Sequence, residues 1–285
     1  MIGRKNAKLY LFKVWFCFLL FVFLQGGVIV GYFVVTGASS GIGEAICYAL
    51  AKRGYSLILV ARREELLKQL KSDILKKYKV KVEVLPFDLS DMKQTELLYE
   101  ACQIYSIEGL INNAGFGLFG DFIEINLENE LNMIDLNIKS LHLLSKLFLK
   151  DFVEQDKGYL MNVASTAAFQ SGPLMASYYA TKGYVLQLTE AISYELQMKK
   201  SNVKVSVLCP GPVDTDFQKR AHIQVASTKI KTAEEVAEIA VAGMLKGKEV
   251  IVPGMINRFL LFFNRFIPRK WGRMLVYRNQ LKKQK

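Results

Sequence analysis

Residues 36–43 read TGASSGIG, at the end of the apolar, β-branched segment Tyr32–Thr36. Glycine at positions 37, 41 and 43 lets the backbone turn sharply and approach a phosphate group closely. An amphipathic pattern then begins near residue 43, so the loop opens a helix whose N-terminal N–H groups and dipole attract anions. A strand, a glycine-rich turn and a helix in this order form the context of a dinucleotide-binding loop. This stretch therefore predicts a β/α fold with a phosphate site after its first strand.

The chain after this loop alternates short β-branched runs with longer amphipathic patterns, as β/α units do. We expect strands at Tyr32–Thr36, Leu57–Val60, Val80–Pro86, Gly109–Asn112, Gly158–Val163, Val203–Leu208 and Glu249–Val252. Helical patterns lie near residues 43–53, 63–77, 91–104, 127–152, 176–199 and 233–244. Seven strands and six crossovers predict an α/β, Rossmann-like doubly wound parallel sheet with helices on both faces.

The charges divide the 285 residues into three parts. Residues 1–30 hold four basic and no acidic side chains, and residues 255–285 hold nine and none, within a chain of net charge +12. The middle is therefore nearly neutral. We expect a basic, apolar N-terminal extension (1–30), a Rossmann-fold domain (31–254) and a basic, amphipathic, helical C-terminal extension (255–285). Such ends fit an anionic membrane surface better than a nucleic-acid groove, so no nucleic acid is expected as a partner.

The N-terminal extension contains an almost uninterrupted apolar run, Tyr10–Leu24. The run is shorter than the roughly 20 residues that span a bilayer, and no small-residue cleavage site closes it. Two interpretations stay open: a membrane anchor or interfacial helix over residues 9–30, or an upstream extension of little consequence. The basic residues before the run favour a cytoplasmic N-terminus, and we expect a cytoplasmic protein, either free or held at a membrane through this segment.

The C-terminal extension combines apolar and basic side chains, as in the segment Asn257–Pro268. It could lie on anionic lipid and shield a hydrophobic substrate entrance, or it could pack against the sheet or a partner subunit. The four cysteines and two histidines of the chain have no metal-ligand spacing, so no metal is expected.

Four further motifs follow the glycine loop in order. NNAG occupies residues 112–115, NVAST residues 162–166, YYATK residues 178–182 and CPGPVDT residues 209–215. Tyr178 and Lys182 are four residues apart, so their side chains share one face of a helix, whereas Tyr179 has no lysine at that spacing. An ammonium near a phenol, with a positive nicotinamide ring, would lower the phenol's pKa and let it exchange protons near neutral pH.

Together these motifs resemble those of the short-chain dehydrogenase/reductase (SDR) family. The resemblance implies an NADP(H)-dependent enzyme that interconverts a carbonyl and an alcohol, and it suggests a homo-oligomer. The apolar C-terminal segment suggests that the small-molecule substrate is hydrophobic. It assigns catalytic roles to Asn137, Ser165, Tyr178 and Lys182. Thr166 and Asn132 fit the family pattern less well. Two alternatives with the same fold stay open: a noncatalytic NADP(H) sensor and a membrane-associated scaffold.

The resemblance also implies a set of cofactor contacts. The second strand ends in Ala61-Arg62-Arg63 without a carboxylate, which favours NADP(H) over NAD(H), because guanidinium groups accept a 2′-phosphate. We assign Arg62 to this phosphate ahead of Arg63; both could instead cover the first turn of an exposed helix. The implied cofactor-binding residues are Thr36, Gly37, Ser39, Ser40, Gly41, Ile42, Gly43, Arg62, Asp88, Asn113, Ala114, Gly115, Tyr178, Lys182, Pro210, Gly211, Val213 and Thr215.

Overall fold

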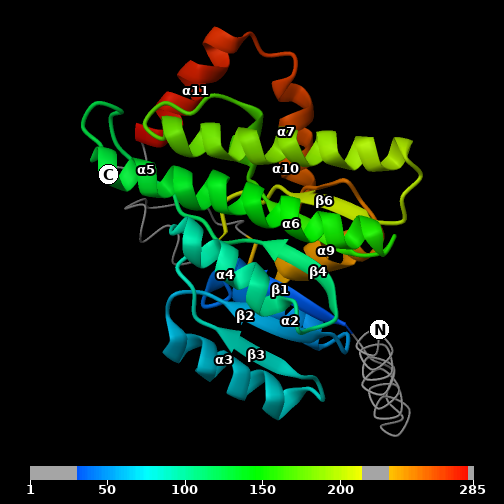
Figure 1. The fold of residues 1–285 in the computed structure, drawn as a ribbon. Helices are drawn as coiled ribbons and strands as arrows, with labels where there is room; N and C mark the ends of the chain where they lie inside the picture. Colours follow the sequence, from blue (N-terminus) through cyan, green and yellow to red (C-terminus); the bar gives the residue numbers. More distant parts are fainter. Residues whose placement is uncertain (1–30, 214–230, 282–285) are drawn as a thin grey trace, which may run out of the picture. The chain divides into compact units, whose positions relative to one another are not determined.

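The centre of the fold is a seven-stranded parallel sheet (Figure 1). The computed structural model describes residues 31–213 and 231–281. The strands are β1 (Tyr32–Thr36), β2 (Ser56–Val60), β3 (Val82–Leu85), β4 (Ile107–Asn112), β5 (Tyr159–Val163), β6 (Lys204–Leu208) and β7 (Val250–Ile251). Their spatial order is β3-β2-β1-β4-β5-β6-β7, so the winding reverses between β1 and β4. Crevices for ligands form at such a reversal, outside the carboxyl ends of the strands.

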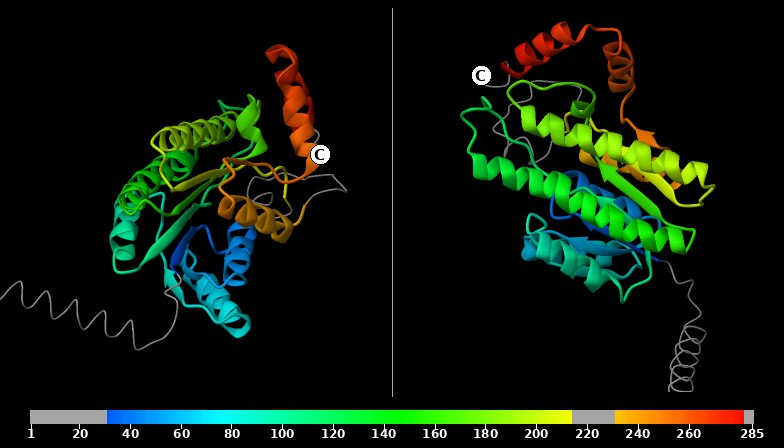
Figure 2. Two further views of the ribbon diagram at one scale, coloured as in Figure 1. Left: turned by 90° about the vertical axis from the view of Figure 1, so that its right-hand side faces the viewer. Right: turned by 45° about the horizontal axis from the view of Figure 1, so that its top comes forward.

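Helices cover both faces of the sheet (Figures 1 and 2). On one side lie α2 (Gly41–Ala51), α3 (Glu64–Lys77) and α9 (Ala233–Leu245), and on the other lie α4 (Met92–Cys102), α6 (Leu141–Glu154) and α7 (Ala176–Met198). Side chains along a strand alternate between these layers. Phe33 and Val35 join the core with α2, α3 and α9, whereas Val34 joins the core with α4 and α6. The predicted fold class is therefore confirmed.

The long helical pattern near residues 127–152 is three elements rather than one helix. It consists of α5 (Leu127–Ile134), a π-helical turn η1 (Asp135–Ser140) and α6. A π-helical turn inserts an extra residue into an α-helix and often marks a functional site. Sequence periodicity does not reveal such an insertion, because the apolar pattern continues through it.

Two helices follow β7: α10 (Met255–Asn264) and α11 (Arg269–Leu281). Figure 1 shows α10 leaving the sheet edge and α11 returning toward the first turn of α7. Within residues 31–213 and 231–281, no helix has both the length and the apolar character needed to cross a membrane. The predictions for residues 1–30 and for Thr215 concern positions outside the described residues.

Candidate active site

A cavity of about 1530 Å³ lies at the carboxyl ends of the strands. Its wall is formed by the loops after β1 to β6, by the start of α9, and by α10 and α11. The predicted site residues that border it are Gly37, Ser39, Ser40, Gly41, Ile42, Arg62, Asp88, Asn113, Ala114, Gly115, Ser165, Tyr178, Lys182, Pro210, Gly211 and Val213. The structure thus brings together residues that are up to 176 positions apart in the sequence, from Gly37 to Val213. The predicted site residues Thr36, Gly43 and Asn137 do not line the cavity.

The glycine loop has the backbone that its composition predicts. Gly37 and Gly41 have φ angles of +66° and +60°, in the left-handed region that favours glycine. At Gly43 a Cβ would collide with the carbonyl oxygen of Gly37 and the amide of Asn113. Ser40, the N-cap of α2, makes no side-chain capping bond. Its hydroxyl therefore does not occupy the N–H groups in the first turn of the helix, and another acceptor can bind them. An anionic group fits this cradle.

Thr36 and Asn113 join the loops after β1 and β4. The Thr36 hydroxyl accepts hydrogen bonds from the backbone N–H groups of Asn113 at 2.9 Å and Ala114 at 3.0 Å. In return the Asn113 side-chain amide donates to the carbonyl oxygens of Thr36 at 3.0 Å and Gly37 at 3.2 Å. These reciprocal bonds hold the two loops together at the point where the sheet reverses its winding.

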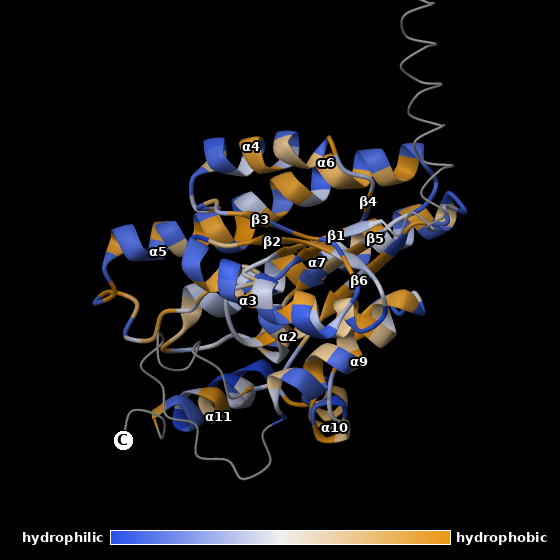
Figure 3. Cartoon of the chain, turned by 90° about the horizontal axis from the view of Figure 1, so that it is seen from below, coloured by the Kyte–Doolittle hydropathy of each residue, from blue (hydrophilic) through white to orange (hydrophobic). Residues whose placement is uncertain are grey.

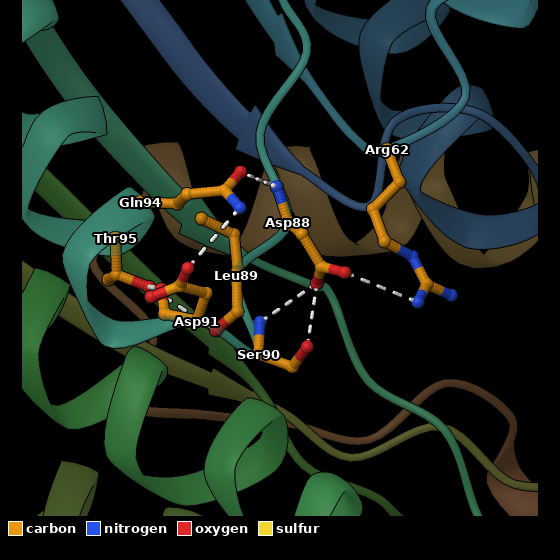
Figure 4. Close-up of polar contacts among 7 residues, drawn as sticks. All are labelled: Arg62, Asp88, Leu89, Ser90, Asp91, Gln94 and Thr95. Atoms are coloured by element: carbon orange, nitrogen blue, oxygen red, sulfur yellow. Dashed lines mark hydrogen bonds and ion pairs between the residues drawn. The ribbon is translucent and has the colours of Figure 1, made fainter.

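The two arginines after β2 contact different parts of the cavity wall. Arg62 forms an ion pair with Asp88, with 3.5 Å between Nη1 and Oδ2 (Figure 4). Arg63 instead donates from Nη2 to the hydroxyls of Ser39 at 3.0 Å and Ser40 at 3.1 Å. Both arginines line the cavity, but only Arg63 contacts the glycine loop.

Asp88 is held from two sides (Figure 4). Its Oδ1 accepts hydrogen bonds from the Ser90 backbone N–H at 3.0 Å and the Ser90 hydroxyl at 2.8 Å, while Oδ2 faces Arg62. Partial burial acts to raise the pKa of Asp88, but the bonds from Ser90 and the charge of Arg62 outweigh it and hold the pKa below its usual range. Asp88 is therefore a carboxylate at neutral pH. Helix α4 is capped by Asp91, not by Asp88.

Ser165, Tyr178 and Lys182 meet at the floor of the cavity. Tyr178 and Lys182 lie one turn apart on α7, and both are buried. The Lys182 ammonium donates to the carbonyl oxygen of Val163 at 2.8 Å and lies 6.0 Å from the centroid of the Tyr178 ring. Ser165 follows β5, and its hydroxyl accepts from the Ala167 N–H at 3.1 Å. A side-chain hydrogen bond also links Ser165 with Tyr178.

The pKa of Tyr178 is raised in the protein alone, whereas the sequence analysis expects a lower pKa with a positive nicotinamide ring beside the phenol. Burial raises it to about 12, and the hydrogen bond with Ser165 opposes this rise without cancelling it. Burial also lowers the pKa of Lys182 to about 8. In the protein alone, desolvation therefore dominates the pKa of this phenol. The contribution that we expected from a positive nicotinamide ring stays a prediction.

Asn137 lies in the π-helical turn and is fully buried. Its Nδ2 donates to the carbonyl oxygen of Phe116 at 2.9 Å and to the hydroxyl of Thr181 at 3.1 Å, and its Oδ1 accepts from the Phe116 N–H at 3.1 Å. A Cβ at Gly115 would lie 2.8 Å from this Oδ1 and 3.6 Å from the Lys182 ammonium. Asn137 thus connects the loop after β4 to α7, next to Lys182.

Two features of the site went unrecognised in the sequence. Asn112, Ser145, Asn162 and Thr189 form a buried hydrogen-bonded network between β4, β5, α6 and α7. Gln280 of α11 is also buried and donates to the Tyr179 hydroxyl at 3.0 Å. The motif residues Asn112 and Asn162 offered a partial signal for the network. Nothing in the sequence indicated that Gln280 contacts a residue 101 positions earlier.

Comparisons with known proteins agree with this arrangement. Residues 32–226 match the family described as short chain dehydrogenase. An NADP-dependent 3-hydroxy acid dehydrogenase of Schizosaccharomyces pombe is 29% identical over 231 residues, which cover 77% of this chain and 88% of the relative. A 7beta-hydroxysteroid dehydrogenase of Clostridium sardiniense is 32% identical over 182 residues, or 64% of this chain and 69% of the relative.

A solved structure extends the likeness to three dimensions. The short-chain dehydrogenase from Sphingobium yanoikuyae in complex with NADPH superposes with a TM-score of 0.75 at 28% identity, covering 88% of this chain and 95% of that one. The family match covers more than half of the chain and includes the glycine loop, the tyrosine and lysine pair and the loop after β6. The chain therefore belongs to the short-chain dehydrogenase family.

Proposed function

We propose that this protein is an NADP(H)-dependent oxidoreductase that interconverts a carbonyl and an alcohol on an apolar substrate. The observation that carries the proposal is the position of Ser165, Tyr178 and Lys182 on one cavity wall, beside a glycine loop with two arginines. NADPH, when bound, supplies a hydride. The reaction also needs a proton donor and a group that positions the carbonyl, and side chains of this protein take both roles.

The proposed proton donor is Tyr178. Its raised pKa keeps the phenol protonated at neutral pH, so it can donate a proton to the carbonyl oxygen as that oxygen gains negative charge. The Ser165 hydroxyl donates a hydrogen bond to the same oxygen and orients it. Lys182, whose pKa is near 8, is the group that passes a replacement proton toward Tyr178. Asn137 acts as a positioning residue, because it holds Phe116 and Thr181 around the lysine.

Several observations support NADP(H) over NAD(H). The strand β2 ends at Val60 and is followed by Arg62 and Arg63, both on the cavity wall, with no carboxylate at the strand end. Guanidinium groups bind a 2′-phosphate, whereas a carboxylate would repel it. The S. pombe relative is NADP-dependent, and the S. yanoikuyae structure contains NADPH.

The apolar substrate is proposed from the other end of the cavity. There α10, α11 and the turn between them contribute Leu260, Leu261, Ile267, Leu275 and Val276 to the wall. The C. sardiniense relative is a 7beta-hydroxysteroid dehydrogenase. The homo-oligomer, the cytoplasmic location and the membrane contact of residues 9–30 stay predictions.

The test compares NADPH oxidation by the wild type, Tyr178→Phe and Tyr179→Phe, with ketones graded from small and polar to long-chain and sterol-like. Loss of a general acid lowers turnover by about 10² to 10⁴-fold, so we expect such a loss in Tyr178→Phe, with NADPH binding unchanged. Tyr179→Phe removes the corresponding hydroxyl oxygen from the neighbouring tyrosine, which also lines the cavity, and turnover should fall by less than about tenfold. Retained turnover in Tyr178→Phe would refute the mechanism.

Two alternatives share the fold, and the same assay separates the enzyme from both of them. A noncatalytic sensor would bind NADPH tightly and turn over no ketone. A membrane-associated scaffold would bind lipid without turnover. The set of Asn137, Ser165, Tyr178 and Lys182 favours the enzyme, because neither alternative needs a phenol, a hydroxyl and an ammonium at one cavity wall.

A further inference from the structure

The helices α10 and α11 expose an unusual amount of apolar surface. No residue of α10 is buried, although seven of its ten residues are Met, Ile, Leu or Phe. Four neighbouring rings, which we call the phenylalanine cluster, lie on α10 and in the turn after it: Phe259, Phe262, Phe263 and Phe266. Phe259 is 62% exposed and Phe266 is 71% exposed. A contiguous apolar patch of this kind usually marks a binding surface.

The charged side chains of α10, α11 and the turn between them all have one sign. Between residues 255 and 281 the sequence contains six arginines and lysines and no acidic residue: Arg258, Arg265, Arg269, Lys270, Arg273 and Arg278. Trp271, 60% exposed, lies among them on α11. In Figure 3, α10 and α11 alternate apolar and polar segments. Basic side chains with exposed aromatic rings are typical of helices that lie in the headgroup region of anionic membranes.

We propose that α10 and α11 form a docking surface for an anionic lipid bilayer. A second copy of the chain is the less favourable occupant. A symmetric dimer through this face would bring two sets of six cations together with no acid from either patch to neutralise them. Anionic headgroups provide the missing negative charge, and the acyl region accepts the phenylalanine cluster. This surface is independent of the apolar run in residues 9–30.

The surface also borders the cavity, which gives it a consequence for catalysis. Residues of the same two helices, among them Leu260, Leu261 and Leu275, line the cavity wall, whereas the phenylalanine cluster does not. Docking would therefore place the apolar end of the cavity at the membrane. An apolar ketone could then pass from lipid to the site without crossing water, a step that rests on the proposed function.

Trp271 provides a local probe of docking. The chain has two tryptophans, so Trp15→Phe leaves Trp271 as the only reporter in the full-length protein. We expect its emission to shift to the blue, and to be quenched by brominated acyl chains, with vesicles that contain phosphatidylserine but not with pure phosphatidylcholine. Because the signal comes from α11, binding through residues 9–30 alone would not produce it.

Matched variants in this background separate the contributions. Neutralising Arg269, Lys270 and Arg273 to Gln should weaken the phosphatidylserine response by about tenfold to a hundredfold, and added salt should act in the same direction. Phe259→Ser with Phe262→Ser and Phe266→Ser should weaken it by at least about tenfold. The control makes the same type of change on other exposed apolar residues, Leu75, Leu97 and Ile104, and should leave the response unchanged.

Several outcomes would overturn the proposal. One is a Trp271 emission spectrum that does not change when vesicles are added, and another is an equal change with neutral and anionic lipid. A third is a blue shift that grows with protein concentration in the absence of lipid, which would indicate that a second copy of the chain covers the surface. Turnover is measured separately, with a water-soluble and a lipid-dissolved ketone. If Trp271 responds but no ketone is reduced, the docking surface stands and the proposed enzyme fails.

Discussion

Arg62 and Arg63 are adjacent residues with different partners. Arg62 pairs with Asp88, whereas Arg63 binds two hydroxyls of the glycine loop. If Arg63 holds the 2′-phosphate together with that loop, Arg63→Ala should raise the KM for NADPH by about 10- to 100-fold, since a charge-assisted hydrogen bond contributes roughly 1.5–3 kcal/mol. The KM for NADH should change little. Steady-state kinetics with both cofactors measures the ratio.

The matched variant is Arg62→Ala. Our interpretation of the sequence ranked Arg62 first, and the geometry now gives Arg63 at least an equal part. A larger loss of NADPH affinity in Arg62→Ala than in Arg63→Ala would restore the original order. Equal changes with NADPH and NADH in both variants would mean that neither arginine recognises the 2′-phosphate.

Lys182 makes stability depend on pH. Burial lowers its pKa from the usual 10.5 to about 8. Between these two pKa values the unfolded chain binds more protons than the folded one, so the free energy of unfolding rises with pH. Below about pH 8 the lysine is charged in both states, and the folded protein bears the full cost of burying the charge. From about pH 7.5 to about pH 9.5, the unfolding free energy of the wild type should gain about 2 kcal/mol relative to Lys182→Met.

Urea denaturation at the two pH values measures this difference. Lys146→Met, at an exposed position of α6, controls for the substitution itself. The range stops below pH 10 because the raised pKa of Tyr178 acts in the opposite direction above it. A difference between wild type and Lys182→Met that stays flat with pH would show that the lysine is not desolvated.

At the scale of elements, the π-helical turn between α5 and α6 depends on Asn137. Asn137→Ala would leave the N–H and carbonyl of Phe116 without their side-chain partner, and it would remove a bond to Thr181. We expect a loss of about 2–4 kcal/mol in unfolding free energy. Turnover should fall as well, because Phe116 and Lys182 border the cavity.

Asn129→Ala is the control for this change. Asn129 is an exposed residue of α5, so its replacement should alter stability by less than about 0.5 kcal/mol. Denaturant titration and ketone reduction are measured on both variants. Similar stability for Asn137→Ala and the wild type would mean that water replaces the lost bonds and that the turn does not depend on this side chain.

The elements also show what the sequence could and could not predict. Strands such as β1 and β2 were recognised because buried parallel strands are continuous apolar runs with turn residues at their ends. The π-helical turn was missed because its signal is a hydrogen-bond shift and not a change in periodicity. The burial that raises the pKa of Tyr178 was not predicted, because sequence spacing does not reveal how deeply a side chain is buried.

At the scale of the whole molecule, the order of motifs predicted which loops meet, because the carboxyl ends of parallel strands lie at one edge. No comparable rule predicts the contacts that residues after β7 make with the site. Gln280 contacts Tyr179 because α11 folds back toward the first turn of α7. The lysine- and arginine-rich sequence of this segment does not indicate which of its residues face α7. The substrate end of the cavity was therefore the part of the site least accessible to sequence analysis.

The cavity joins loops from both halves of the sheet, so NADPH should stabilise the molecule as one unit. Gly37 follows β1, Ser165 follows β5 and Pro210 follows β6, and all three border the cavity. At NADPH concentrations about 100 times the Kd, the unfolding free energy should rise by about 2.7 kcal/mol in a single transition. NADH at the same concentration should give a smaller rise. If NADPH split the transition into two, the loops would not be coupled through the site, and the single-cavity geometry behind the proposed function would be wrong.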